Sequence, residues 1–435
     1  MPTDLRDKLR RLGVHKGAAR IKPPAAPRRE RGGGIETLVD GREVDTPFGP
    51  AFFHEEAYGA DHPHGGHALG DVLGQSPAVA AQLANQPALA DMDLSRVVFL
   101  DTETTGLAGG TGTLVFLVGI GAFNVQPPAV SVQPPGVSIQ RSSFRVQQFF
   151  LRSPAEEPAM LHALAERLDA FDAVVSFNGR GFDLPLLDAR FRLARMRPRF
   201  LSAPHLDLLP PARRMWRGRL PSCALSSLEQ HVLDVRREQA DVPGYLIPGM
   251  YVHYVESGDA SEMPRVLYHN TVDILSMVSL STRLLRLFDA SSRQSQEAGT
   301  PADAGDLLAL GKWHDDLGRV SDAESALRSC LACQPEPATR TSALHRLGFL
   351  LKRAGRRAEA VAVWEALAEA RSAEGIDACV ELAKHYEWHA GDARRAATLT
   401  RKAMATARRL PPGTLRDQIE AELAHRLERL ARKRE

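Results

Sequence analysis

The sequence predicts an α/β domain, in which a mixed sheet is flanked by helices, followed by an all-α domain of helical repeats. Two observations carry this prediction. From residue 96, short apolar runs of strand length alternate with segments of helical periodicity. From about residue 303 the chain is Ala-rich and helical in pattern, and similar segments recur along it. At 435 residues the chain is also too long for one compact core.

The α/β domain is placed at residues 96–292. Residues 156–169 have a helical pattern, and residues 124–143, rich in Gln, Pro, Ser and Val, read as an inserted hairpin loop. Three successive strands followed by alternating helix and strand predict an antiparallel meander within a mixed sheet, with helices packed on it. The predicted strands are 97–100, 114–123, 145–151 and 173–177.

Two segments precede this domain. Residues 1–44 are predicted to be a flexible basic arm, because the first 31 residues hold ten Lys or Arg against three Asp or Glu. Such an arm is either a solvated tail or a contact to a phosphate backbone. Residues 45–95 are expected to form a structured loop that leads into the domain. Three histidines in it lack the Cys or carboxylate that would complete a tetrahedral metal site.

Residues 300–435 form the predicted repeat domain. Glycine ends a helix readily because it adopts the left-handed conformation, and alanine lets two helices cross closely. Three segments resemble tetratricopeptide-type repeats, closed by a capping helix, and such arrays present surfaces for a protein partner. Their glycines, each followed five positions later by an alanine, are Gly318 with Ala323, Gly355 with Ala360, and Gly391 with Ala396.

Acidic residues stand at the ends of the predicted elements. Asp101 and Glu103 are two positions apart after the first apolar run, so a strand would point both to one face, where they can share Mg²⁺ or Mn²⁺. For a D-x-E pattern taken alone, two solvated acids at an ordinary strand end are the more common explanation. Asp183 begins a predicted helix, where it can be a cap. Asp273 lies in an apolar helical pattern, where an aspartate needs a partner or a metal. Asp207 is a cap or a fifth acid.

Three motifs in order resemble those of the DEDD (DnaQ-like) 3′–5′ exonucleases of the ribonuclease-H fold: DTETTGL, FNGRGFD and YHNTVD. Residues 45–290 more closely resemble the YprB family of ribonuclease-H-like proteins, through TPFG, LAGGTGT, LDLLPPARRMWRGRLPSCALSSLE and VPGYLIPGMYVHYVESGD. The resemblance implies a ribonuclease-H-like fold and metal-dependent hydrolysis of phosphodiester bonds in nucleic acid. It also implies that two divalent cations, Mg²⁺ or Mn²⁺, are bound by Asp101, Glu103, Asp183 and Asp273.

The third motif departs from both subclasses of that superfamily. One subclass has histidine five residues before the aspartate, and the other has tyrosine four residues before it. Here Tyr268 stands five and His269 four residues before Asp273. On a continuous helix His269 lies about 40° from Asp273 and Tyr268 about 140° away. We expect His269 to position or deprotonate the attacking water, because its ordinary pKa is near neutral, with Tyr268 as the alternative.

Candidate contacts to nucleic acid lie between the second and third motifs. Asn178 ends a predicted strand and is expected to orient nucleic acid or a carboxylate by hydrogen bonding. Arg213, Arg214 and Arg217 surround Trp216, so that guanidinium groups can pair with phosphates while the ring stacks on a base. The alternative is a solvated helical face with Trp216 in the core. No group that reads a 2′-hydroxyl is recognisable, so the expected substrate is single-stranded DNA or RNA.

The composition indicates in which cellular environment the protein is expected to act. The chain has no apolar run of about 18 residues and no secretory signal, so no membrane association is expected. Four cysteines indicate no disulfide framework, and we expect a cytoplasmic protein. The leading hypothesis is a metal-dependent nuclease, most simply a 3′–5′ exonuclease. The alternative is a non-catalytic nucleic-acid-binding or scaffold protein with the same fold.

Overall fold

The computed structural model describes residues 34–106, 112–123, 143–238, 241–289 and 302–433. Most of the predicted basic arm and all but the last residue of the predicted 124–143 insertion lie outside these ranges. The chain divides into two compact units. The first comprises Met1–Arg213 and Leu220–Gly299, and the second comprises Thr300–Glu435 together with the short stretch Arg214–Arg219.

The first unit is built on a seven-stranded mixed sheet in the order β1-β2-β7-β6-β5-β8-β9. Neighbouring strands from β1 to β5 are antiparallel, whereas β8 and β9 continue the sheet in parallel. The predicted meander is therefore confirmed, and so is the mixed sheet. The strands are β1 (Gly41–Thr46), β2 (Gly49–Gly59), β5 (Val97–Thr104), β6 (Val115–Phe123), β7 (Ser143–Phe150), β8 (Ala173–Ser176) and β9 (His205–Asp207), and a separate pair is formed by β3 (Pro63–His64) and β4 (His67–Ala68).

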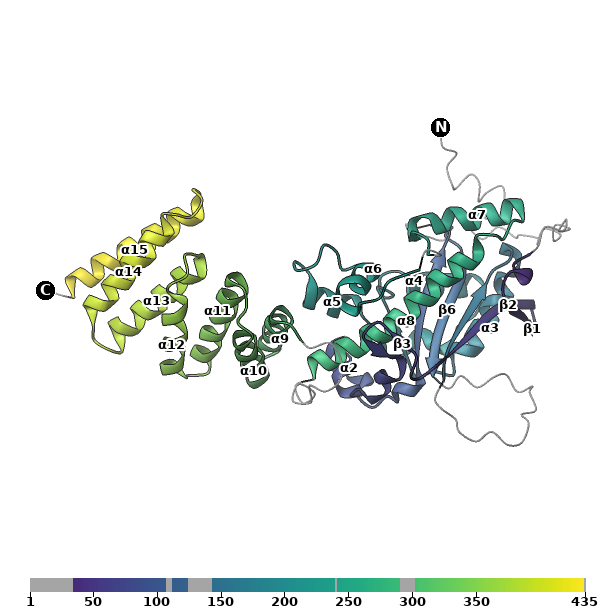
Figure 1. The fold of residues 1–435 in the computed structure, drawn as a ribbon, viewed down its shortest axis with the longest axis horizontal. Helices are drawn as coiled ribbons and strands as arrows, with labels where there is room; N and C mark the ends of the chain where they lie inside the picture. The colour runs from purple at the N-terminus through teal and green to yellow at the C-terminus, as the bar shows by residue number, and fades with distance from the viewer. Residues whose placement is uncertain (1–33, 107–111, 124–142, 239–240, 290–301, 434–435) are drawn as a thin grey trace. The chain divides into compact units, whose positions relative to one another are not determined.

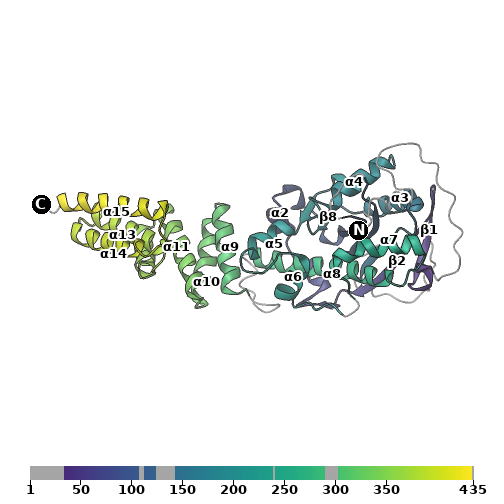
Figure 2. The same cartoon turned by 90° about the horizontal axis from the view of Figure 1, so that it is seen from above.

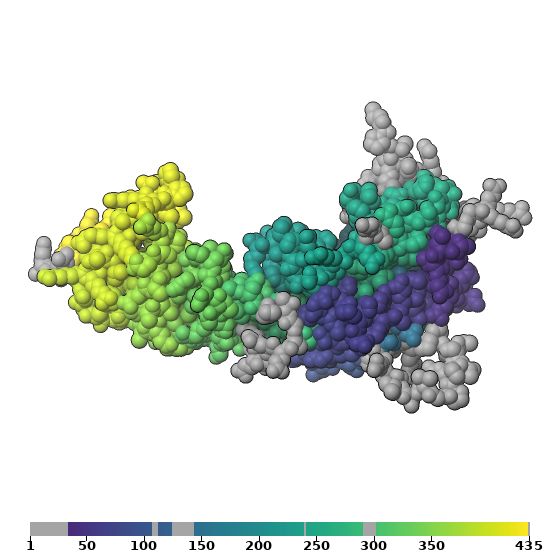
Figure 3. Space-filling model, in the orientation of Figure 1, coloured from purple at the N-terminus to yellow at the C-terminus, as the bar shows by residue number. Residues whose placement is uncertain are grey.

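The strands β1 and β2 of this sheet lie where a flexible arm and a structured loop were expected. The prediction of an arm is therefore wrong for residues 41–44, and that of a loop is wrong for most of residues 45–59. The alternation of apolar and polar residues in β2 is imperfect, which hides the strand in the sequence. Phe52 and Phe53 of β2 are buried, and the segment is continuous with the body of the first unit (Figure 3, purple). The two histidines His64 and His67 are also buried, and burial lowers the pKa of each to about 4.

Helices cover both faces of the sheet. The long helix α8 packs against β5, β6 and β7, while α3 packs against β1, β2 and β7 (Figure 1). The view from above separates α3 and α4 from α8, with strands between them (Figure 2). The helices of this unit are α2 (Pro77–Ala84), α3 (Glu157–Leu168), α4 (Asp183–Leu193), α6 (Leu225–Leu228), α7 (Ile247–Ser257) and α8 (Met263–Phe288), and the residues of α5 (Leu209–Trp216) are divided between the two units.

The second unit consists of successive helices, as the repeat pattern predicts. The residues Gly318, Gly355 and Gly391 have φ of +72°, +76° and +67°, and the alanine five positions after each glycine is fully buried. No described helix in either unit is long and apolar enough to cross a membrane. The helices of the second unit are α9 (Ala304–Asp316), α10 (Val320–Ala332), α11 (Pro337–Arg353), α12 (Arg357–Leu367), α13 (Ala373–Trp388), α14 (Ala393–Ala407) and α15 (Thr414–Arg432).

Candidate active site

The first motif lies where β5 ends. Four buried apolar residues precede Asp101, and the side chains then alternate: Asp101 and Glu103 are half-buried, whereas Thr102 and Thr104 are buried. The two carboxylates therefore share one face of the sheet, as predicted from their spacing. The register with β6 shifts between Glu103 and Thr104, which marks the end of regular pairing. Both acids belong to the last regularly paired residues of β5, and both contact residues of α8: Asp101 contacts Asn270, and Glu103 lies near His269.

The second motif brings Asp183 to the same place. Asp183 is the first residue of α4 and its carboxylate accepts a hydrogen bond from the Thr102 hydroxyl, between the two acids of β5. It is 5% exposed. Burial raises the pKa of Asp183 to about 6, although the hydrogen bond from Thr102 acts in the opposite direction.

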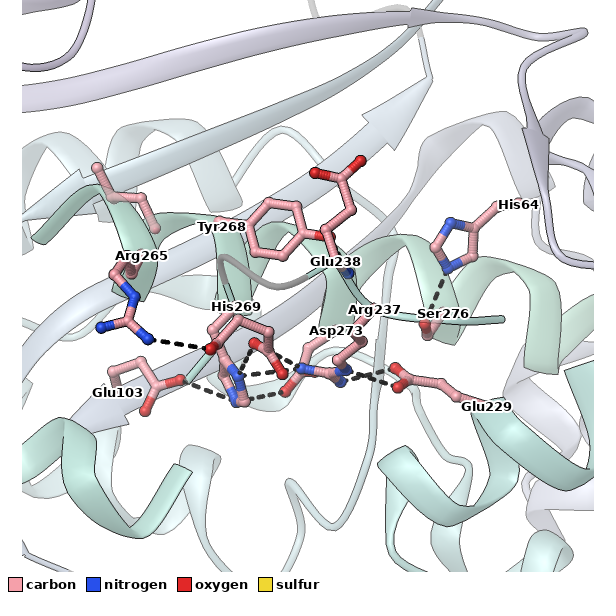
Figure 4. Close-up of polar contacts among 12 residues, drawn as sticks. His64, Glu103, Glu229, Arg237, Glu238, Arg265, Tyr268, His269, Asp273 and Ser276 are labelled. Carbon is pink, nitrogen blue, oxygen red and sulfur yellow. Dashed lines mark hydrogen bonds and ion pairs between the residues drawn. The ribbon is translucent and has the colours of Figure 1, made fainter. Parts of the chain in front are cut away.

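The third motif lies on α8, which is helical without interruption from Met263 to Phe288. His269 consequently faces the acids: its Nε2 atom lies 3.9 Å from Glu103 Oε1 and 3.7 Å from Asp273 Oδ2. Tyr268 points elsewhere, and its hydroxyl accepts a hydrogen bond of 3.0 Å from the backbone N–H of Glu238. Figure 4 shows the two side chains diverging from neighbouring positions of the helix.

The four carboxylates are electrostatically unfavourable to one another. Burial raises the pKa of Asp101 well above its ordinary value, and the charges of Asp273, Asp183 and Glu103 raise it further. Burial likewise raises the pKa of Glu103, again with contributions from Asp273 and Asp183. Carboxylates from three separate elements thus lie close enough to repel, in surroundings that disfavour their charge. Such perturbation is typical of functional sites.

Asn270 holds the first of these acids in place. Its Nδ2 atom donates a 2.8 Å hydrogen bond to Asp101 Oδ2, and its Oδ1 atom accepts one from Gln148 of β7. The helix can come this close because β6 has glycine opposite: a Cβ atom at Gly119 would lie 1.9 Å from Asn270 Oδ1. Sequence analysis missed Asn270 as a functional residue, although it stands inside the YHNTVD motif.

A positive side chain also enters the site. The Arg237 guanidinium donates to Asp273 Oδ1 and to both carboxylate oxygens of Glu229, and its Nη1 atom lies 3.0 Å from His269 Nδ1 (Figure 4). The same ring nitrogen lies 2.7 Å from Asp241 Oδ1. No pattern in the sequence marks Arg237, which lies in an irregular segment between the second and third motifs. Glu229 ends the stretch LDLLPPARRMWRGRLPSCALSSLE that resembles the YprB family, but no role was predicted for it.

Asp207 supports the second motif from β9. Its carboxylate accepts hydrogen bonds from the backbone N–H groups of Asn178, Arg180 and Leu209, at 2.8–3.1 Å. These bonds engage the carboxylate with backbone donors, so of the two predicted roles the structure favours the cap. Asn178 has φ of +68°, and its exposed side chain is available to a ligand beside Asp183.

The arginine patch predicted around Trp216 is not a base-stacking site. Trp216 is 2% exposed, and its Nε1 atom donates a 2.9 Å hydrogen bond to Asp306 within the second unit. Arg214 forms an ion pair of 2.8 Å with Asp316. The prediction of stacking is therefore wrong, and the alternative of a core tryptophan holds. Arg213 and Arg217 are exposed, so their predicted phosphate contacts stay predictions.

An exposed aromatic residue instead follows a glycine that lies close to His269. Tyr245 is 72% exposed, and the preceding residue, Gly244, is so near the third motif that a Cβ atom on it would be 3.7 Å from His269 Nε2. A tyrosine ring exposed to this extent buries little apolar surface within its own unit. The ring of Tyr245 therefore presents a π-face to solvent, one residue after Gly244.

Residues 98–285 match a family model described as the RNase_H superfamily. They form a ribonuclease-H-like domain. The chain is also 30% identical over 295 residues to the uncharacterized protein YprB of Bacillus subtilis (strain 168), and the alignment spans 67% of this chain and 65% of YprB. The predicted resemblance to ribonuclease-H-like proteins of the YprB type is thus confirmed, and the four acids all lie within the ribonuclease-H-like domain.

The donor chemistry of this site fits a hard divalent cation, because half-buried or buried carboxylates whose charge is disfavoured are stabilised by Mg²⁺ or Mn²⁺. The side chains, however, are not arranged as the ligands of a bound cation. Within the described ranges, no group of three or more His, Cys, Asp or Glu residues is placed to hold an ion. Arg237 donates a hydrogen bond to Oδ1 of Asp273, one of the carboxylate oxygens available to a cation.

Proposed function

We propose that the ribonuclease-H-like domain is a metal-dependent nuclease that hydrolyses phosphodiester bonds of single-stranded DNA or RNA as a 3′–5′ exonuclease. The observation that supports this most strongly is the convergence of Asp101, Glu103, Asp183 and Asp273 from β5, α4 and α8. Their burial and mutual repulsion raise the pKa of both acids on β5. A protein has no structural need for such a cluster, whereas a two-cation site requires it.

The four carboxylates would hold two divalent cations, which supply a hydroxide nucleophile at neutral pH and stabilise the leaving oxygen. Asn270 fixes the orientation of Asp101 by donating to Oδ2, which leaves Oδ1 for a cation. His269 lies between Glu103 and Asp273 and is placed to accept a proton from the attacking water. Tyr268 is held by Glu238 and is the weaker alternative for this role.

Substrate contacts are proposed for two residues at the margin of the acids. The exposed side chain of Asn178 precedes the Asp183 helix and can donate to a phosphate or a base edge. Tyr245 can stack on the terminal base, since every base presents a π-face to an exposed aromatic ring. The helices of the second unit are proposed to form tetratricopeptide-type repeats that bind a protein partner.

The test is digestion of 5′-labelled single-stranded DNA and RNA by the full chain with Mn²⁺ or Mg²⁺, beside Asp101→Asn. A descending ladder from the wild type and none from the variant is the expected result. A substrate labelled at the 5′ end distinguishes polarity, because a 5′–3′ enzyme would release the label at once. Intact substrates under all conditions, with undiminished binding, would contradict hydrolysis.

A second function is supported by one observation, the absence of a ready ligand set among the described residues. In that case the domain would bind nucleic acid without cleaving it, and the acids would be held by Arg237 and Asn270. Binding of a labelled oligonucleotide that is equal with Mn²⁺ and with chelator, and equal for Asp101→Asn, would favour this function.

A further inference from the structure

Arg237 is the cation that the structure places among the acids of the site. Its side chain is 12% exposed and lies between Glu229, which is 2% exposed, and Asp273, which is 16% exposed. Two hydrogen bonds of 2.6 and 2.7 Å join it to Glu229, and a third joins it to Asp273 Oδ1. Asp241 is a third acidic neighbour, at 3.5 Å. The guanidinium is therefore held by acids on several sides.

The bond to Asp273 distinguishes Arg237 from a purely structural arginine. Glu229 alone forms a bidentate pair with it, which already neutralises both charges. The remaining Nη2–H bond is directed to a carboxylate of the third motif, the residue that a metal-dependent nuclease of this fold needs as a ligand. A guanidinium and a divalent cation at the same carboxylate repel each other, so each weakens the binding of the other.

We propose that Arg237 competes with the divalent cation for Asp273, so that metal binding requires this guanidinium to leave Oδ1. The inference rests on the proposed function, since it concerns the same metal site. It explains why the four acids, although gathered, are not arranged as a ligand set. It also assigns a role to Arg237 that goes beyond the four motif carboxylates. Removing the competing charge should tighten binding of the cation, because like charges in partly buried sites repel strongly.

The chain offers a matched control in Arg152. This arginine is 8% exposed and, like Arg237, is surrounded by acids of the first unit: Glu36, Glu43 and Glu156. None of those three acids belongs to the nuclease motifs. Arg152→Gln therefore removes a buried arginine and leaves three acids without it, as Arg237→Gln does, but spares the site.

The experiment is calorimetric titration of Mn²⁺ into the full-length wild type, Arg237→Gln and Arg152→Gln at constant ionic strength, without nucleic acid. We expect the Kd of Arg237→Gln to fall by about tenfold or more and that of Arg152→Gln to stay within about twofold of the wild type. A Kd for Arg237→Gln that is unchanged or higher would overturn the competition. If wild type, Arg237→Gln and Arg152→Gln all fail to bind Mn²⁺, the proposed metal site itself is overturned.

Arg237→Gln leaves the buried carboxylate of Glu229 without its cationic partner and can prevent folding, so a second comparison is needed. Glu229→Gln keeps Arg237 on Asp273, whereas the double variant Glu229→Gln/Arg237→Gln leaves a neutral pair and frees Asp273. Both are first checked for folding by circular dichroism. The double variant should bind Mn²⁺ about tenfold more tightly than Glu229→Gln alone. Equal affinity of these two variants would contradict the proposal even if Arg237→Gln cannot be purified.

Discussion

Each unit of the chain buries carboxylates, and the motif acids of the first unit differ from Glu387 of the second in how their charge is compensated. In the first, burial and neighbouring acids raise the pKa of Asp101 and Glu103 well above the ordinary range. In the second, burial alone would raise the pKa of Glu387, but hydrogen bonds from Arg429 and Lys433 outweigh it and the pKa is lowered. Its side chain is fully buried and also lies 3.4 Å from Arg426.

The comparison shows what a structural carboxylate looks like in this protein. Glu387 is paired with three cations, Arg426, Arg429 and Lys433, and Glu381 is similarly bonded to Lys352 and Lys384. Among the motif acids of the first unit, Asp273 meets Arg237, whereas Asp101 and Asp183 accept hydrogen bonds from the neutral groups of Asn270 and Thr102. A cluster that is left with excess negative charge opposes folding, so its presence indicates a function rather than a stabilising role. The same substitution, carboxylate to amide, should therefore have opposite effects in the two units.

The largest expected effect is that of Glu103→Gln. Cleavage should fall about 10³-fold, equivalent to about 4 kcal/mol of activation free energy, because a metal-binding charge is lost. In the presence of chelator the free energy of unfolding should rise by about 1 kcal/mol, since repulsion is relieved. Ladder formation measures the first quantity, and hydrogen exchange of peptides from β5 and α8 in urea measures the second. A less stable variant would show that the acids are not mutually repulsive.

In the second unit Glu387→Gln should destabilise the packing of α13 against α15 by about 3 kcal/mol, because three cations lose their partner. Hydrogen exchange of α13–α15 peptides measures the loss. Glu369→Gln is the control: this side chain is 78% exposed and pairs with Lys402 at 2.7 Å, so an effect below about 0.5 kcal/mol is expected. Equal effects of the two substitutions would remove the distinction between buried and surface pairs.

Lowering the pH should destabilise the second unit, because its buried carboxylates are bound in their charged form. The pKa values of Glu381 and Glu387 are lowered in the fold, where lysine and arginine bonds outweigh the opposing effect of burial. Their contribution is therefore present above the ordinary carboxyl pKa and is lost as pH falls through the lowered values. Protection of α13–α15 should decrease by about 1–2 kcal/mol from pH 5 to pH 3, and by less in Glu387→Gln. Protection that increases toward pH 3 would contradict the assignment.

Local regularity made part of this site predictable. Side chains alternate on any strand, so Asp101 and Glu103 could be placed on one face, and one continuous helix is enough to turn His269 toward Asp273. Contacts between distant segments were not predictable. Asn270 lies 169 positions from Asp101, and their hydrogen bond depends on Gly119 letting α8 approach the sheet.

The arginines also show that contacts between distant segments could not be predicted from the sequence. Composition pointed to the 213–217 cluster, where charge and an aromatic ring alternate in sequence, but helical periodicity does not say what a face packs against. Trp216 turned out to have a buried acid, Asp306, as its partner. Arg237, in a stretch without motif or periodicity, is the arginine that reaches the acids.

The smallest expected effect is that of replacing Tyr245, an exposed aromatic residue, which differs from the buried Trp216. Tyr245 is 72% exposed and follows the glycine beside His269, whereas Trp216 is buried in the other unit. If Tyr245 stacks on the terminal base, Tyr245→Ala should raise KM about fivefold, or about 1 kcal/mol, with kcat nearly unchanged. Tyr245→Phe keeps the ring and should retain the wild-type KM. Steady-state cleavage of short oligonucleotides measures both constants, and equal KM values for alanine and phenylalanine would exclude stacking, because only the phenylalanine variant preserves the π-face on which a base can lie.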